Sequence, residues 1–305
     1  MGHSLKSQLK NAVHRSFKEG RNKHEEKLKD KKWRDKGNSW SYETKHDRLD
    51  NASRLANFIS ENWPEIKLAN EIKVEHIQAY LDDCRDRGAT QATLQGYSSN
   101  CRALCRELEN CYKSVGKIDT RKIKTPTAVN KKIRDHQMDT AARDELLKSN
   151  STNVVNAAIL SAAFGLRSQE ITKVKAKDIY GMDGKIMCHV ERGKGNRNRE
   201  VVAINKERGR MALLLKEKYS DEDKLVPIKD KSLERAITRE LKKSGKHEKY
   251  IGLHAARKTW AQEIYDIYRK NNHTKLETIV FVNEQLGHSG ERDVKLLEKY
   301  VARIW

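Results

Sequence analysis

The chain has 305 residues, a formal net charge of +20 at pH 7 and 35% charged residues. A chain of this length can bury a substantial core, and we expect two domains rather than one or many. So much positive charge on a folded surface predicts a polyanionic partner. No apolar run is long enough to span a bilayer and no signal-peptide core follows Met1, so we expect a soluble, cytoplasmic protein without a membrane partner.

The cysteine pattern argues against both a disulfide framework and a zinc site. The count is odd, and no paired C-x-x-C spacing occurs among Cys84, Cys101, Cys105, Cys111 and Cys188. We therefore expect reduced thiols and no bound metal. Cys101 and Cys105 lie one helical turn apart beside leucines, which predicts that they fill a core stripe.

Residues 1–38 are predicted to form a basic N-terminal arm, in which few acids offset many lysines and arginines. Apolar residues recur at every fourth position, namely at Leu5, Leu9, Val13 and Phe17. This spacing indicates a basic amphipathic helix, which could lie against DNA, a partner helix or its own domain. A solvated basic arm fits the composition equally well.

Residues 39–116 keep helical spacing of apolar positions and predict a small helical domain. Gly88 is expected to end one helix, and Thr90 can cap the next. The other face of that second helix carries Gln91, Gln95, Arg102 and Arg106. Arg102 and Arg106 are our candidates for contact with DNA, although a charged helix face is more often merely solvated.

Residues 117–137 are the predicted linker between the domains, because this stretch is basic, contains almost no acids and is interrupted by Pro126. Such a linker can cross a groove of DNA and neutralise phosphates, which gives affinity without sequence information. The candidate phosphate contacts are Lys122, Lys124, Lys131 and Lys132.

Residues 138–305 are predicted to form a second domain, mostly α with a small antiparallel β insert. Helical spacing covers 138–149 and 154–165, and short β-prone runs at 186–190 and 200–203 surround glycine-rich turns. Helices are expected again at 206–219, 231–244, 254–270, 276–286 and 293–300.

Several side chains of the second domain suit phosphodiester chemistry, which needs a nucleophile, cations around the non-bridging oxygens and an acid for the departing sugar oxygen. Arg167 follows Gly165, where an apolar helix is expected to break and a new helical turn to start. An arginine there can turn its planar fork inward toward a phosphate. Taken alone, the segment Gly165–Ile171 is explained more simply by a surface arginine or by a structural pair of Arg167 with Glu170.

Lys194 stands between Gly193 and Gly195 at the expected hairpin tip, where flanking glycines let the backbone approach a ligand. A mobile ammonium at this place could reach a leaving oxygen, and the neighbouring Arg192 and Arg197 could contact DNA. Exposed turns often contain lysine, so a solvated turn explains Gly-Lys-Gly by itself.

His254 and Arg257 stand three residues apart at the start of an expected helix, so both can lie on one face and converge on one phosphate. In a chain with 11 histidines and abundant arginine, this spacing also arises by chance. His288, in Leu-Gly-His, is by itself more typical of a packed histidine at a helix end.

The order of these signals says more than any one of them. Gly-Leu-Arg-x-x-Glu, Gly-Lys-Gly, His-x-x-Arg, Leu-Gly-His and a late tyrosine follow one another along the chain. In this order the chain resembles the tyrosine recombinase (phage integrase) family. The resemblance covers about 138–300 and, more loosely, the helical domain, which looks like the family's core-binding module around 90–108.

The resemblance implies an N-terminal core-binding domain, a C-terminal catalytic domain and a role for each candidate residue. Arg167 and Arg257 would clamp the scissile phosphate, and Lys194 would be the general acid. His254 would assist proton transfer at the nucleophile, and His288 would hydrogen-bond the transition state.

Tyr300 would be the nucleophile, and it is the only tyrosine after His288. Taken without the resemblance, Tyr300 can also be explained as a half-buried aromatic side chain on an amphipathic terminal helix. Three features depart from the family pattern: Ala255–Lys258 replaces a common Leu-Arg-His, the interval from His288 to Tyr300 is wide, and only Val301–Trp305 follow the nucleophile. The short tail leaves open whether it docks on a neighbouring protomer.

The implied function is site-specific DNA recombination through a 3′-phosphotyrosyl intermediate, without cofactor or metal. The expected task is integration or excision of a mobile element such as a viral genome. The expected assembly is a homotetramer on paired sites of double-stranded DNA, in the cytoplasm at the nucleoid. Accessory proteins that bend DNA or set direction would be further partners.

Three other functions are compatible with parts of the sequence. A type IB topoisomerase would use a related constellation of residues, and a non-catalytic DNA-binding protein could keep the same fold. A metal-dependent nuclease could use Asp221, Glu222 and Asp223, but these acids stand beside Ser220 in an expected exposed turn.

Overall fold

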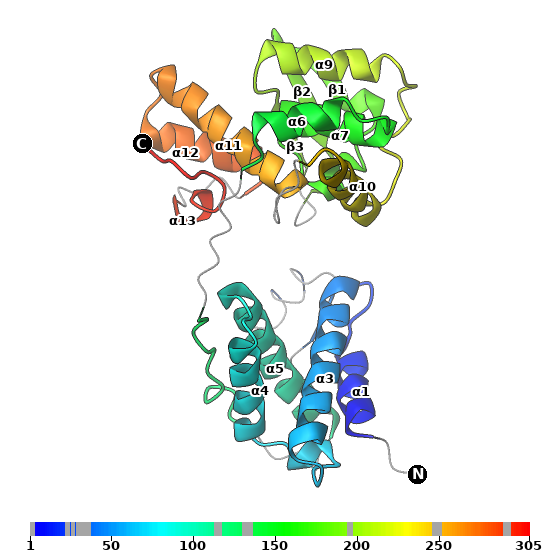
Figure 1. Ribbon diagram of the computed structural model, residues 1–305, viewed down its shortest axis with the longest axis vertical. Coiled ribbons are helices and arrows are strands. Elements are labelled where there is room, and N and C mark those ends of the chain that lie inside the picture. Colours follow the sequence, from blue (N-terminus) through cyan, green and yellow to red (C-terminus); the bar gives the residue numbers. More distant parts are fainter. Residues whose placement is uncertain are drawn as a thin grey trace. The chain divides into compact units, whose positions relative to one another are not determined.

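The structure is a computed structural model that describes residues 4–21, 25, 28, 38–112, 118–129, 137–193, 198–245, 252–288 and 294–305, without the side chains of 295 and 296. The chain divides into two compact units, Met1–Ile133 and Arg134–Trp305, each with its own hydrophobic core (Figure 1).

The first unit is helical, as predicted. Its described elements are α1 (Leu5–Ser16), α3 (Tyr42–Asn62), the 3₁₀ turn η2 (Ala69–Glu71), α4 (Val74–Asp86) and α5 (Gln91–Cys111). Gly88, with φ +81°, follows the end of α4, and the Thr90 hydroxyl caps α5 by accepting from the backbone N–H of Thr93. Cys101 and Cys105 are buried in the core, as expected.

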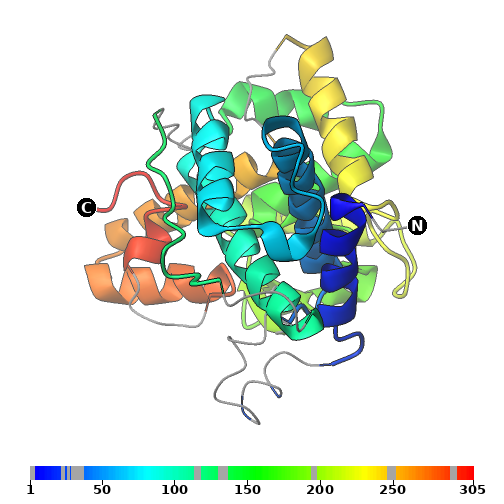
Figure 2. The same ribbon diagram turned by 90° about the horizontal axis from the view of Figure 1, so that it is seen from below.

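The basic amphipathic helix expected in the N-terminal arm is α1, and it packs against its own domain. It lies beside α3 and α5 (Figure 2), and its apolar stripe of Leu5, Leu9 and Val13 is buried in their core. The hydroxyl of Tyr112 donates to the Gln8 carbonyl at 3.2 Å, and the Gln8 amide donates to the Lys67 carbonyl at 3.1 Å. The start of the expected arm thus belongs to the core of the helical unit.

Residues 118–129, expected in the linker, also pack on this unit. Ile123 is buried, and its carbonyl accepts from the Arg102 guanidinium at 2.7 Å. Gln91 holds the next turn by donating to the Pro126 carbonyl and accepting from the Ala128 N–H. The polar face of α5 therefore holds the following chain segment as well as facing solvent.

The second unit is mostly helical around a three-stranded antiparallel sheet. Its elements are α6 (Thr140–Leu147), α7 (Thr152–Phe164), α8 (Ser168–Ile171), η3 (Ala176–Asp178), β1 (Ile179–Met182), β2 (Lys185–Val190), β3 (Arg199–Val202), α9 (Lys206–Lys216), α10 (Asp230–Lys243), α11 (Leu253–Lys270), α12 (Lys275–Gln285) and α13 (Val294–Leu297). The fold class, mostly α with a small antiparallel β insert, is confirmed.

The sheet has the order β1-β2-β3, and its register explains which face is buried. Ile179 pairs with Cys188, which pairs with Val201, and all three side chains point into the core. Val190 pairs with Arg199, so β2 and β3 run antiparallel on either side of the segment predicted to carry Lys194, and Lys194 itself lies outside the described residues.

Two turns shape the second unit near α11. Gly165 ends α7 with φ +58°, and a Cβ on it would lie 2.4 Å from the Trp260 ring, so only glycine fits.

The last helix is shorter than predicted, because α13 ends at Leu297 and the chain turns there. The Tyr300 N–H bonds back to the Leu297 carbonyl at 2.8 Å, which places Tyr300 in the turn after the helix.

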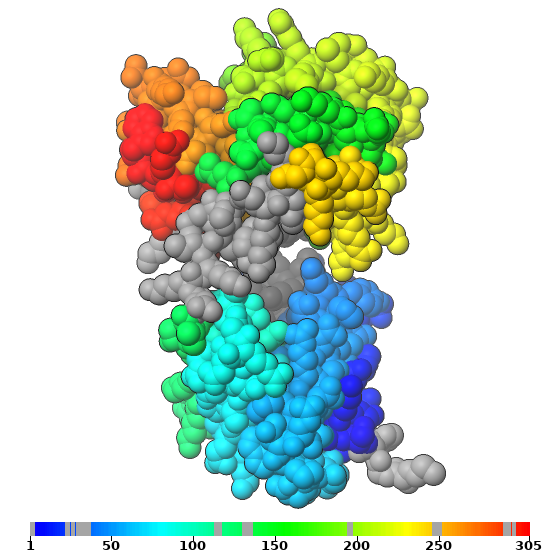
Figure 3. Space-filling model, viewed as in Figure 1, coloured from blue at the N-terminus to red at the C-terminus, as the bar shows by residue number. Residues whose placement is uncertain are grey.

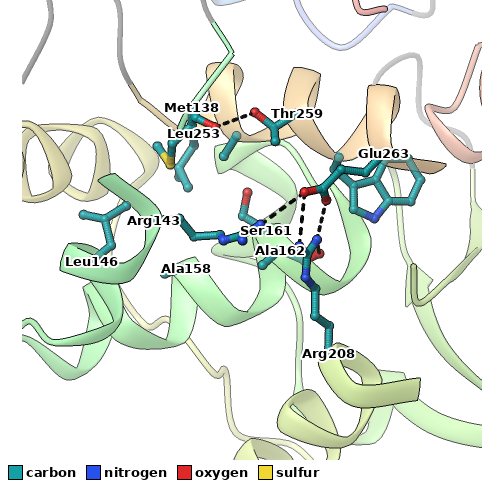
Figure 4. A pocket seen from close by; sticks show the side chains of 12 residues that line it. Met138, Arg143, Leu146, Ala158, Ser161, Ala162, Arg208, Leu253, Thr259 and Glu263 are labelled. Atoms are coloured by element: carbon teal, nitrogen blue, oxygen red, sulfur yellow. Dashed lines mark hydrogen bonds and ion pairs between the residues drawn. The ribbon is translucent and has the colours of Figure 1, made fainter. Parts of the chain in front are cut away.

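A small pocket beside α11 shows how neighbouring elements are fastened to this helix (Figure 4). The hydroxyl of Thr259 donates to the Met138 carbonyl at 2.9 Å, which anchors the chain as it enters α6. Glu263 accepts from Arg208 on α9, with one contact at 3.2 Å, and from Arg143 on α6 at 3.4 Å. These contacts fasten α9, α6 and the chain that precedes α6 to the middle of helix α11.

Candidate active site

Arg167 lies at the start of α8 with its guanidinium directed toward the end of α12. Its Nη1 donates to Glu170 Oε1 at 2.8 Å, and its Nη2 donates to the Leu286 carbonyl at 3.1 Å. The same Nη2 lies 3.4 Å from His288 Nε2. Arg167 forms the structural pair with Glu170 that the sequence allowed, and contact with a phosphate stays a prediction.

Arg257 is fully buried below this cluster. Its Nη1 and Nη2 donate to the carbonyls of Gly165 and Leu286, each at 2.5 Å. Its Nε is buried and has no hydrogen-bond partner in the described part of the protein. Burial and the nearby Arg167 lower the pKa of Arg257 to about 9, while the carboxylate of Glu170 opposes this shift.

Tyr300 meets three of the predicted catalytic residues. The centroid of its ring lies 5.1 Å from that of His288 and 5.7 Å from that of His254. The Arg257 Cζ lies 5.6 Å from the ring centroid. His254 and Arg257 come from the first turns of α11, His288 from the turn after α12, and Tyr300 from the turn after α13. The structure thus brings together five of the six predicted catalytic residues.

Glu170 is the electrostatic centre of the cluster. It accepts from Arg167 and Arg199, and it lies 3.8 Å from Arg257. Burial alone would raise its pKa, but the hydrogen bonds and charge of Arg199, the charge of Arg257 and the backbone N–H of Arg167 hold the pKa at about 2. A carboxylate that is ionised at neutral pH therefore balances part of the charge of three arginines that would otherwise repel one another.

Arg199, at the first position of β3, is a member of the cluster that the sequence interpretation missed. Its Nη1 and Nη2 donate to the two oxygens of Glu170, each at 2.9 Å, and its Nε donates to the Gln285 carbonyl at 3.1 Å. Its side chain is only 11% exposed. The available signal was an arginine directly before the β-prone run 200–203.

Several candidates lie outside the described residues, namely Lys194, Arg197, Lys131 and Lys132. Arg192, at the base of the hairpin tip, is exposed and lies 3.5 Å from Glu191. Lys122 and Lys124 are exposed on the docked segment 118–129, and Arg106 is half-buried on α5. The DNA-contact candidates of the first unit thus include exposed lysines on a fixed surface.

Two adjoining hollows beside α8 add basic residues that the sequence interpretation did not single out. One is lined by Gln169, Thr172, Lys173, Lys224 and Lys229, among others. The other shares Lys173 and Lys224 and extends to Glu170 and Arg192. The second hollow therefore reaches from these lysines to Glu170, the carboxylate that pairs with Arg167 and Arg199.

The residues that the structure describes contain no group of three or more His, Cys, Asp or Glu side chains placed to hold a metal ion. Glu222, a candidate for the nuclease alternative, accepts at 2.6 Å from Lys175 and also pairs with Lys177. Among the described helices, none combines the length and the apolar character that crossing a bilayer requires.

Comparison with known proteins gives a family match for the first unit. Residues 26–109 match the family described as phage integrase, N-terminal. Helix α1 precedes the matched residues, although it shares their core. No curated protein matches the chain.

Solved structures match nearly the whole chain at low sequence identity. The XerH site-specific recombinase bound to palindromic difH substrate is 16% identical, with a TM-score of 0.64 over 97% of this chain and 90% of that one. A lambda integrase tetramer bound to a Holliday junction is 14% identical, with a TM-score of 0.65 over 99% and 79%. The Tn1549 transposon integrase with circular intermediate DNA is 13% identical, with a TM-score of 0.59 over 99% and 96%. The resemblance to the tyrosine recombinase (phage integrase) family is thereby confirmed, and this chain has the fold of that family's core-binding and catalytic domains.

Proposed function

We propose that the protein is a site-specific DNA recombinase that cleaves and rejoins strands through a covalent bond between Tyr300 and a DNA phosphate. One observation carries the proposal: the Tyr300 ring lies within 5.7 Å of the rings of His254 and His288 and beside the buried Arg257. A phenol surrounded by imidazoles and a guanidinium can lose its proton and attack a phosphate held by the same cations.

The chemistry assigns one role to each residue. Arg167, Arg257 and His288 would donate to the non-bridging oxygens of the scissile phosphate, and His254 would accept the phenol proton. The Tyr300 oxygen would form a bond to phosphorus while the bond from phosphorus to the 5′ oxygen breaks. Lys194 would give its proton to that departing oxygen. The reverse reaction, with the 5′-hydroxyl of a partner strand, would rejoin the DNA without an external energy source, because the phosphotyrosyl bond conserves the energy.

The DNA backbone is proposed to follow the lysine-lined hollows beside α8 and the exposed lysines of segment 118–129. These side chains supply point charges for phosphates rather than donors for base edges, so they would contribute affinity without sequence preference. Replacing Lys173, Lys224 and Lys229 should lower the slope of log affinity against log salt by about 0.9 per lost contact. An unchanged slope would remove the hollows from the interface.

Similar structures support the assembly that we propose. Lambda integrase is seen as a tetramer on a Holliday junction, and XerH and the Tn1549 integrase are seen with their DNA substrates. By analogy, this chain would act as a homotetramer on paired sites, with accessory DNA-bending proteins, and would integrate or excise a mobile element.

The experiment that tests the function is recovery of DNA that becomes covalently bound to the protein. Genomic fragments carrying random nicks are incubated with the protein, denatured, and enriched for DNA that stays attached. Two linear fragments with the recovered site should then exchange ends. Relaxation of supercoils without exchange would favour the topoisomerase alternative, and specific binding without attachment would favour a non-catalytic DNA-binding protein.

A further inference from the structure

Arg199 joins three parts of the catalytic unit that are far apart in sequence. Its two terminal nitrogens bind both oxygens of Glu170 at 2.9 Å, and its Nε binds the Gln285 carbonyl at 3.1 Å. These three hydrogen bonds hold the guanidinium in one orientation, because its donors have a fixed planar geometry. The side chain is 11% exposed, so these contacts are shielded from water.

The far side of Arg199 packs against the turn that presents His288. A Cβ placed on Gly287 would lie 2.9 Å from Arg199 Nη1 and 3.1 Å from its Cδ, so the side chain fills the space beside this glycine. The Gln285 side chain completes the link, because its Oε1 accepts from the Val202 N–H at 2.8 Å. Strand β3 is therefore fastened to the end of α12 by both a side chain and a backbone group.

Arg199 also reaches Arg167 through one shared carboxylate. Glu170 Oε1 accepts from Arg167 Nη1 at 2.8 Å and from Arg199 Nη1 at 2.9 Å, while Glu170 Oε2 accepts from the Arg167 backbone N–H. If Arg199 were absent, Glu170 could rotate away from this arrangement. Arg167 would then lose the partner that fixes its fork.

We propose that Arg199 is a positioning residue of the active site, which locks Glu170 and thereby Arg167 against the turn that carries His288. It does so from the first position of β3, five residues after Lys194 in the sequence. This proposal rests on the proposed function, since the geometry that it fixes is that of the phosphate clamp. Arg199 itself contacts neither Tyr300 nor the catalytic histidines through any hydrogen bond recorded among the described residues.

Arg208 offers a matched control within the same unit. It also pairs with a carboxylate through both terminal nitrogens, that of Glu263, and it also donates to a backbone carbonyl, that of Ala162 at 3.3 Å. The partners of Arg208 in these bonds, Glu263 and Ala162 (Figure 4), are not among the residues assigned to the phosphate clamp. A purely structural arginine should therefore behave as Arg208 does.

The test compares Arg199→Lys with Arg208→Lys. Lysine keeps the charge but cannot span two carboxylate oxygens and a carbonyl. We expect both variants to melt at a lower temperature and to bind DNA within a few-fold of the wild type. Single-turnover formation of the covalent adduct at saturating DNA should fall about 100-fold in Arg199→Lys, as expected for a small misplacement of catalytic groups. It should stay within a few-fold of the wild type in Arg208→Lys, and equal rates in the two variants would overturn the proposal.

A second readout needs no DNA and so separates this proposal from the proposed function. The carboxyl carbon of Glu170 is followed by NMR in protein labelled at glutamate, with Glu170→Gln used for assignment. In the wild type this carboxyl should stay ionised well below pH 4.5, and in Arg199→Met it should titrate closer to 4.5. An unchanged titration would show that Arg199 does not hold Glu170. A wild type that forms no adduct, with the titration shifted as expected, would overturn the proposed function alone.

Discussion

The ring of His288 lies 5.1 Å from the ring of Tyr300, although the two residues follow different helices, α12 and α13. The turn that presents His288 also supplies the Leu286 carbonyl, which accepts from Arg167 and Arg257. One turn thus holds two cations and one imidazole around the phenol. Its geometry therefore determines where a phosphate would have to bind.

Acidification should remove the stabilising contribution of Glu170. Its folded-state pKa of about 2 lies below the ordinary 4.5, so the contribution is complete above pH 4.5 and is lost as the pH falls toward 2. The shift corresponds to roughly 3 kcal/mol. Urea unfolding of the wild type and Glu170→Gln should differ by about this amount at pH 7, and the difference should shrink below pH 4.5 and vanish only as the pH falls to about 2. A difference independent of pH would contradict the assignment.

Gly165→Ala should be strongly destabilising because two costs combine. The residue has φ +58°, and an added Cβ would meet the Trp260 ring at 2.4 Å. Gly184 is the control, since it has φ +71° and open space around a Cβ. Thermal and urea unfolding should show a loss of about 1–2 kcal/mol for Gly184→Ala, from the left-handed backbone alone. Gly165→Ala should lose about 2 kcal/mol more from overpacking, and equal losses would show that the Trp260 contact relaxes freely.

Lys194→Ala should slow cleavage of an ordinary strand far more than cleavage of a strand whose bridging 5′ oxygen is replaced by sulfur. Sulfur leaves without an acid, so only the loss of a general acid is rescued by this substitution. Arg192→Ala, from the same hairpin, serves as control and should affect both strands alike. Equal defects of Lys194→Ala on both strands would mean that Lys194 binds or positions DNA.

Tyr300 is expected to act in the active site of its own protomer. The residues after it dock on α11 of the same chain: the Gln262 amide donates to the Arg303 carbonyl at 3.1 Å, and the Tyr265 hydroxyl donates to the Trp305 carbonyl at 2.9 Å. In Figure 3 the C-terminal residues, in red, lie against the orange part of the same unit. A mixture of Tyr300→Phe and Arg257→Ala proteins should therefore remain inactive in cleavage. Restored cleavage by the mixture would show that the tyrosine is delivered to a neighbouring protomer.

Much of the fold could be predicted from the sequence, because the spacing of apolar residues indicates the buried face of a helix and glycine indicates where a helix ends. The breaks at Gly88 and Gly165 lie where the left-handed backbone requires them, and the apolar stripe of α5 is buried as expected. The end of α13 could not be predicted, since the pattern near Tyr300 continues past the last helical hydrogen bond. Local periodicity does not reveal where tertiary contacts stop a helix.

The site was only partly predictable for a related reason. Arg167, His254, Arg257 and His288 stand in recognisable local motifs, whereas Arg199 acquires its role through contacts with residues that are distant in sequence. Arg102 was a candidate for contact with DNA because it lies on a polar helix face. In the structure it instead donates to the Ile123 carbonyl and holds the chain segment that follows α5. Spacing along one element indicates a shared face, but it does not identify the partner across space.

The most direct test of the central claim is to locate the protein atom that becomes joined to DNA. The wild type is incubated with a recovered site that is nicked just beyond the scissile phosphate, digested with protease, and analysed by mass spectrometry of the DNA-linked peptide. The account predicts an adduct on Tyr300 that is absent from Tyr300→Phe and retained in the control Tyr268→Phe, with DNA affinity of both variants within a few-fold of the wild type. An adduct that persists in Tyr300→Phe, or that maps to another residue, would contradict it.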